Sequence, residues 1–179
     1  INGYVFSGCS NLKTITPFLP AHVSSIGTEA FNECSVTGNL TILSKTLTSI
    51  PGKAFRYTKL DTIDLSRSVV TSIGTAAFNY TTAVKLVMPK KLATVEDAPF
   101  EQTSQLAEVQ FYAFPENGLP GNLFKNSTGL PARLLFPAGD EGWLDFVTNH
   151  AKFVAWDATA AGDRTAYLAK YPSLPRPLG

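Results

Sequence analysis

Phenylalanine recurs at a nearly constant interval through the first two thirds of this chain. The six copies are separated by 25, 24, 23, 22 and 24 residues, and they are Phe6, Phe31, Phe55, Phe78, Phe100 and Phe124. A period of this length, held over several copies, is typical of a solenoid, in which each coil buries its apolar side chains against its neighbours. We therefore expect an extended repeat structure with a continuous core.

Three other columns of similar residues keep step with the phenylalanines. Five residues before each one lies an aliphatic residue, at Ile1, Ile26, Ile50, Ile73, Val95 and Leu119. The residue directly before each phenylalanine is small or of modest size, as expected if it packs in a cramped site under the aromatic ring. Three residues after each phenylalanine lies a small residue with one S–H or O–H group, and these residues are Cys9, Cys34, Thr58, Thr81, Thr103 and Ser127. We expect this column to form a ladder inside the solenoid and to donate to backbone carbonyls of the next coil.

Each coil also contains two segments with the pattern of a strand. The first is short and ends on the aliphatic residue, as in residues 23–26, 47–50, 70–73 and 92–95. The second alternates, and its inward residues are Ile15 and Pro17, Leu40 and Ile42, Ile63 and Leu65, Leu86 and Met88, Val109 and Phe111, and Leu134 and Phe136. A period of two predicts half-buried strands. No long helical pattern occurs within residues 1–137, so strands and turns should dominate.

The combined pattern V-x-x-I-G-x-x-A-F-x-x-C fits residues 23–34 best and recurs with small departures over residues 1–137. It resembles the BspA-like leucine-rich repeat. The resemblance implies a strand-dominated α/β fold, namely a leucine-rich-repeat solenoid of about six coils of 22–25 residues with a C-terminal helix-strand cap. It also implies a bacterial protein that is secreted or held at the cell surface and serves adhesion or recognition. The family motif is structural, so it transfers no catalytic or ligand-binding residue to this chain.

The two ends of the solenoid should differ from its middle. Residues 1–137 are interpreted as the solenoid, and residues 138–179 as a C-terminal cap and Pro-rich tail of the same domain. The cap should contain an amphipathic helix over residues 140–147, a closing strand over 152–156 and a short helix over 163–171. The sixth coil should be looser, since residues 116–119 depart from the Val-Ser-Ser-Ile type. Residue 1 aligns inside a truncated coil, so we expect a signal sequence, and further repeats, upstream.

Composition argues against several classes of partner. The chain has 15 basic and 14 acidic residues and a formal net charge of +1, which predicts no general attraction to nucleic acid or to an anionic membrane. Its densest basic spot, Lys90-Lys91, is interpreted as a solvated turn. No apolar run approaches the ~18 residues that span a bilayer. We predict no nucleic-acid partner and no membrane insertion in this segment, while the oligomeric state stays open.

Cys9 and Cys34 occupy the same position in successive coils. A separation of one strand spacing between their α-carbons would permit a disulfide. Parallel side chains that both point inward, and the Thr or Ser at this position in other coils, favour free buried thiols instead. The sequence leaves both states open.

No pattern of residues favours catalysis. His22 and His150 lie outside any metal or nucleophile motif, and the clustered carboxylates are expected on turns or outward strand positions, at Asp61, Asp64, Glu96, Asp97 and Glu101. The chain has no Gly-rich phosphate loop, Cys/His metal pattern or nucleophile elbow. We predict that the protein is not an enzyme, has no catalytic or metal-binding residue and uses no cofactor.

The outward residues of the second strands are the best candidates for a binding surface. The predicted ligand-binding residues are Thr62, Asp64, Lys85, Glu108, Gln110 and Arg133. Such a stripe could contact an extracellular protein or glycan through many weak contacts, but a solvated sheet face has the same composition. A second candidate is the group Arg56, Tyr57 and Tyr80, because Tyr and Arg are favoured at interfaces. The alternative function is a structural spacer that displays another domain of a longer protein.

Overall fold

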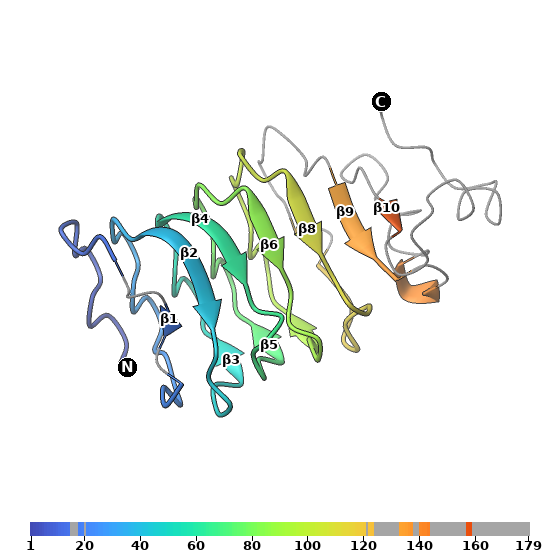
Figure 1. Ribbon diagram of the computed structural model, residues 1–179, viewed down its shortest axis with the longest axis horizontal. Coiled ribbons are helices and arrows are strands. Elements are labelled where there is room, and N and C mark those ends of the chain that lie inside the picture. Colours follow the sequence, from blue (N-terminus) through green and yellow to red (C-terminus); the bar gives the residue numbers. More distant parts are fainter. Residues whose placement is uncertain are drawn as a thin grey trace.

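Parallel strands form two sheets that run along the solenoid (Figure 1). The structure is a computed structural model that describes residues 1–14, 18–19, 21–120, 122–123, 133–137, 140–143 and 157–158. The seven-stranded sheet has the order β1 (Phe18–Leu19), β2 (Thr37–Ile42), β4 (Lys59–Asp64), β6 (Lys85–Val87), β8 (Glu108–Gln110), β9 (Arg133–Phe136) and β10 (Asp157–Ala158). The three-stranded sheet has the order β3 (Ser49–Ile50), β5 (Ser72–Ile73) and β7 (Thr94–Val95). The strand-dominated solenoid predicted from the sequence is confirmed.

Each complete coil passes through the same four parts. From β4 the chain enters a corner turn over residues 65–71, then β5, and then a run of tight turns over residues 74–81 before it reaches β6. We call the stacked tight turns around the phenylalanines the polyturn side; it comprises residues 3–9, 27–34, 51–58, 74–81 and 97–103. Because β6 pairs with β4 and β7 pairs with β5, every coil lies directly beside the previous one.

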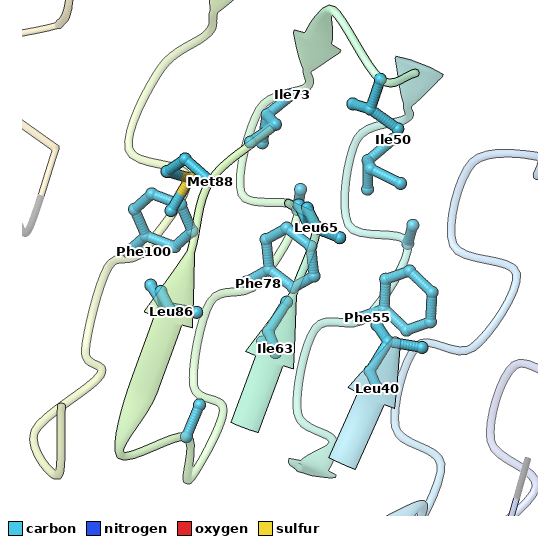
Figure 2. Close-up of a cluster of buried hydrophobic side chains, with 14 of the residues drawn as sticks. Leu40, Ile50, Phe55, Ile63, Leu65, Ile73, Phe78, Leu86, Met88 and Phe100 are labelled. Atoms are coloured by element: carbon cyan, nitrogen blue, oxygen red, sulfur yellow. The ribbon is translucent and has the colours of Figure 1, made fainter. Parts of the chain in front are cut away.

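The core is built from the predicted columns. Phe31, Phe55, Phe78 and Phe100 are buried, and with Phe6 they form one continuous stack. The centroids of neighbouring rings lie 5.3, 5.3, 5.6 and 5.8 Å apart. Figure 2 shows three of these rings side by side, with apolar side chains of β2, β4 and β6 pointing toward them. Burial of one such ring contributes about 1.5–3 kcal/mol, so the stack is a major source of stability. Phe124 lies outside the described residues.

The polyturn side holds ordinary residues in a left-handed backbone conformation. Positive φ values recur two residues before and two residues after each stacked phenylalanine, at Tyr4, Gly8, Glu29, Glu33, Lys53, Tyr57, Ala76, Tyr80, Ala98 and Gln102. The Tyr57 N–H donates to the Asn79 carbonyl of the next coil at 2.9 Å, whereas the Arg56 N–H donates to the Lys53 carbonyl of its own coil at 3.3 Å. This alternation repeats from coil to coil. These hydrogen bonds offset the cost of roughly 1–2 kcal/mol that a non-glycine residue carries in the left-handed conformation.

Gly27 and Gly74 let neighbouring coils approach closely. A Cβ atom at Gly74 would lie 2.6 Å from the backbone nitrogen of Gly52, and one at Gly27 would lie 2.1 Å from that of Gly3. Neither distance is sterically possible, and the neighbouring atoms belong to the backbone and cannot swing aside. The glycine of the repeat pattern therefore has a packing role at these two positions.

Two expectations for the first coil are wrong. Residues 23–26 form no strand, although the same pattern gives β3, β5 and β7 in later coils. In addition, β1 pairs Phe18 with Thr41 and Leu19 with Ile42. Leu19 thus takes the inward position that alternation had assigned to Pro17. The first coil is the longest of those that the spacing defines, and its extra residues precede the strand, so the strand pairs two residues later than expected.

The column of small residues lies inside the solenoid, but its hydrogen bonds differ from the prediction. Thr58 and Thr103 are buried, and each donates through Oγ1 to the carbonyl of the phenylalanine three residues earlier, at 2.8 Å. These acceptors belong to the same coil because a hydroxyl at the end of a tight turn reaches the carbonyl that opens it. Cys34 Sγ contacts the Phe6 carbonyl of the preceding coil. Cys9 and Cys34 are free thiols.

Trp143 closes the C-terminal end of the described core. Its fully buried ring contacts three phenylalanines, with centroid distances of 4.7 Å to Phe111, 5.2 Å to Phe114 and 5.0 Å to Phe136. Residues 141–143 are helical, and Asp140 Oδ1 accepts the Trp143 N–H, as at the start of the predicted cap helix. Residues 144–156, which hold the rest of that helix and the predicted closing strand, lie outside the described residues, as do residues 159–179.

Candidate functional site

The predicted binding residues lie on β4, β6, β8 and β9 in the middle of the seven-stranded sheet. The strand register places Thr62, Lys85, Glu108 and Arg133 in one row across the four strands. Asp64 and Gln110 lie in a second row two residues further along, with Val87 between them. The side chain of Arg133 lies outside the described part of the chain, so its place in the row follows from its backbone.

Lys85 and Glu108 form an ion pair between β6 and β8. Their Nζ and Oε1 atoms lie 2.8 Å apart, and the two side chains are 45% and 18% exposed. An exposed pair of this kind contributes about 0–1 kcal/mol to stability. Its stronger consequence is geometric, because it fixes a positive and a negative group in a defined order across the sheet. The outward pattern of a single strand does not predict this pair. The two residues are one 23-residue coil apart, so a coil-by-coil alignment of the sequence reveals it.

The second row is less open than the alternating pattern suggested. Asp64 Oδ1 accepts the backbone N–H of Ser66 at 2.9 Å and its hydroxyl at 2.6 Å, so the carboxylate stabilises the turn that follows β4. Val87 lies between the inward residues Leu86 and Met88, so the alternation predicts that it points outward, but it is 7% exposed. Gln110 and Thr62 are partly exposed. The sheet therefore presents polar groups that are partly engaged with one another and partly available to a ligand.

The second candidate group forms one cluster on the polyturn side. The rings of Tyr57 and Tyr80 stack with centroids 4.3 Å apart, and Arg56 Cζ lies 4.6 Å and 5.7 Å from the two centroids. Partial burial, followed by the neighbouring Tyr57 hydroxyl, raises the pKa of Tyr80. Tyr57 is exposed. The cluster has the composition of an interface anchor, but its guanidinium already lies over both rings.

Two of the carboxylates that were candidates for catalysis, Glu96 and Glu101, join neighbouring coils. Glu96 Oε2 accepts the backbone N–H and the hydroxyl of Thr75, both at 2.9 Å. Glu101 accepts from Asn79 Nδ2 at 3.2 Å and returns a bond from its own N–H to the Asn79 side chain at 2.9 Å. These contacts are structural and bring no two carboxylates together for acid–base chemistry.

Within the described residues, no three His, Cys, Asp or Glu side chains are grouped as metal ligands would be. His22 is exposed in a turn, and His150 lies outside the described residues. None of the helices in the described part of the chain has the length and apolar character to cross a membrane.

The comparisons with known proteins agree with this architecture. Residues 1–131 match the BspA-type leucine-rich repeat region in six copies. Among solved structures, the chain is similar to a leucine-rich repeat protein from Bacteroides ovatus ATCC 8483, with 23% sequence identity and a TM-score of 0.59. That match covers 77% of this chain and 35% of the other, and at this identity it concerns the fold. The search of curated proteins gave no match. Since the repeat match spans well over half of its length, the chain belongs to the BspA-type leucine-rich repeat family.

Proposed function

We propose that the protein is a non-catalytic recognition module, secreted or held at a bacterial cell surface, that binds an extracellular protein or glycan through its seven-stranded sheet. The contact residues of this proposal are Thr62, Asp64, Lys85, Glu108, Gln110 and Arg133. Residues 1–137 would form the binding solenoid, and residues 138–179 would cap it.

The observation that carries the proposal is the in-register row across β4, β6, β8 and β9. Parallel strands repeat about every 4.8 Å, so the row places polar groups at a regular interval along the solenoid. The ion pair between Lys85 and Glu108 fixes two of these groups in position. Fixed groups lose little conformational entropy on binding, which favours recognition by several weak contacts in parallel.

A charge swap on the sheet tests this proposal. The double variant Lys85→Glu with Glu108→Lys retains an ion pair and the net charge but exchanges the positions of the two charges. We expect it to keep the thermal stability of the unaltered protein and to lose about tenfold or more in affinity for any ligand that the sheet recognises. Binding would be measured on a glycan array and on a panel of purified extracellular-matrix proteins.

The polyturn side supplies a matched control. Lys53 and Glu29 also form an ion pair, at 3.2 Å, with side chains that are 43% and 18% exposed. The corresponding double variant, Lys53→Glu with Glu29→Lys, should leave binding unchanged. Equal losses in both swaps would contradict a site on the sheet.

A spacer function is the second candidate, because two of the sheet residues, Asp64 and Glu108, are engaged in internal contacts. A spacer would bind nothing on either panel while remaining folded. Deletion of the solenoid from the full-length protein would then change the distance between the cell and a displayed domain, and not ligand affinity.

A further inference from the structure

The corner turns between the two sheets carry charge of a single sign. They comprise residues 43–48, 65–71 and 88–93, which connect β2 to β3, β4 to β5 and β6 to β7. Four exposed basic side chains occur there, at Lys45, Arg67, Lys90 and Lys91. The three turns contain no Asp or Glu. We call these four residues the basic corner; the net charge of +1 for the whole chain conceals it.

The stacking of the coils brings the four cations to one edge of the molecule. The register of β4 and β6 continues into the corners, because the Leu65 N–H donates to the Val87 carbonyl at 2.8 Å. This register places Arg67 and Lys90 at corresponding positions of neighbouring turns. Lys45 reaches across from the preceding turn, since its Nζ donates to the Arg67 carbonyl at 3.1 Å. In Figure 1 the three turns follow the arrowheads of β2, β4 and β6 one beside another.

The cations of the basic corner have no carboxylate partner within the described part of the chain. Lys45 donates to a carbonyl, and Lys90 Nζ lies 5.5 Å from the ring centroid of Tyr112. Asp64, at the end of β4, is bonded to Ser66. On the polyturn side, by contrast, charges of both signs occur, and Lys53 forms an ion pair with Glu29. The basic corner is therefore a place where four cations from neighbouring turns lie together without a carboxylate partner among the described residues.

We propose that the basic corner binds a linear anionic polysaccharide through the carboxylate or sulfate groups of its sugars. The cations follow the solenoid axis at about 4.8 Å per coil, which suits a chain with charges at short intervals. The turns also carry exposed hydroxyl groups at Thr46 and Thr48, which can bond to sugar hydroxyls. This site is separate from the sheet residues of the proposed function.

Two other polyanions fit the corner less well. Single-stranded nucleic acid is usually bound in a basic groove with aromatic rings that stack on its bases. The exposed ring beside this corner, Tyr112, already faces Lys90. A membrane surface would be reinforced by several apolar side chains that insert into it. Tyr112 is the one large apolar side chain exposed next to the corner within the described residues.

The test compares two variants of equal charge. The first replaces the basic corner, as Lys45→Gln, Arg67→Gln, Lys90→Gln and Lys91→Gln. The second replaces three lysines and one arginine elsewhere, as Lys13→Gln, Lys53→Gln, Arg56→Gln and Lys59→Gln. Each lowers the formal net charge by four, from +1 to −3 (1 − 4 = −3). Binding to a heparin octasaccharide, polygalacturonate and neutral dextran would be measured by calorimetry at low and at about 0.15 M salt.

We expect the corner variant to bind heparin or polygalacturonate roughly tenfold or more weakly than the unaltered protein, and the second variant to stay within about twofold. Preference between the two polymers distinguishes sulfate from carboxylate recognition. The variant Lys45→Arg, Lys90→Arg and Lys91→Arg should retain binding, which separates charge from folding. Circular dichroism melts confirm that each variant is folded.

Three results would overturn the proposal. One is that the unaltered protein binds neither anionic polymer at low salt. Another is that both four-residue variants lose the same affinity, which would show a general charge effect. The last is tighter corner-dependent binding to oligothymidine or to phosphatidylserine vesicles than to either polysaccharide. None of these results bears on the sheet, so the proposed function would be judged separately by its own charge swap.

Discussion

The polyturn side and the outer face of the seven-stranded sheet differ in how strictly each coil repeats the last. On the polyturn side, the phenylalanine and the alanine before it recur with full burial in the central coils. On the sheet, one outward row contains Asn39, Thr62, Lys85 and Glu108, which share no size or charge. Rings and backbones that touch across coils allow little change. Outward strand positions face solvent and can vary, so stability resides on one side and recognition can develop on the other.

Removal of one ring from the middle of the phenylalanine stack tests whether the polyturn side carries the stability of the fold. Phe78→Ala should lower the free energy of unfolding by about 3–5 kcal/mol, since it leaves a cavity between Phe55 and Phe100. Urea denaturation followed by circular dichroism measures the loss.

The matched control removes an aromatic ring from the surface of the same side. Tyr57→Ala loses the stacking contact with Tyr80 but creates no buried cavity, so it should cost about 1 kcal/mol. If both variants lost the same stability, the buried stack would not be the main determinant of the fold.

A smaller effect is expected where the coils meet through glycine. Gly74→Ala should cost about 1–3 kcal/mol, because the added Cβ would meet the backbone of Gly52 at 2.6 Å. Gly52→Ala is the milder comparison, since its Cβ would lie 3.2 Å from the Thr75 carbonyl oxygen. Thermal melts of the two variants should rank in that order. The reverse order would mean that the coils can separate at Gly74 without penalty.

The core was predictable from sequence because burial recurs with the repeat. Phe31, Phe55 and Phe78 stand at a near-constant interval, and one copy predicts the environment of the next. The left-handed backbone was not predictable, because Lys53 and Tyr57 carry no sequence signal for positive φ. Hydrogen bonds between coils impose that conformation, and a single coil read alone does not contain them.

The candidate sites, like the fold, were predictable from sequence only in part. Alternation along each strand predicted the outward positions, but contacts between side chains depend on the register between coils. The ion pair of Lys85 with Glu108 follows from that register. The basic corner also follows from it, since Lys45, Arg67 and Lys90 are more than twenty residues apart in sequence. Where a coil has extra residues, as before β1, sequence alone placed the strand incorrectly.

The two cysteines occupy the same column of the repeat but differ in exposure, because Cys34 is buried and Cys9 is partly exposed. Burial raises the pKa of the Cys34 thiol, and Cys9 lies nearer the surface. Because the folded protein favours the protonated thiol, Cys34 stabilises it fully below the ordinary thiol pKa and loses this contribution as pH rises through the raised value. Iodoacetamide at about pH 8 should therefore modify Cys9 well before Cys34, as followed by mass spectrometry. Equal rates in the folded protein would contradict the burial of Cys34.

The smallest effect should come from the ion pair on the sheet. Lys85→Ala should change the free energy of unfolding by at most about 1 kcal/mol, since Lys85 is 45% exposed and water screens its charge. A double-mutant cycle with Glu108→Ala isolates the coupling between the two side chains. The coupling should shrink further when salt rises from about 0.01 M to about 1 M.

The result of this cycle determines how far the two sides of the molecule differ. A weak, salt-sensitive coupling means that Lys85 and Glu108 can be exchanged or replaced without risk to the fold, as a surface under selection for recognition requires. A coupling well above 1 kcal/mol that persists in salt would place the pair among the interactions that hold the coils together. The sheet would then constrain the fold as the polyturn side does, and its charges would be poor evidence for a binding site.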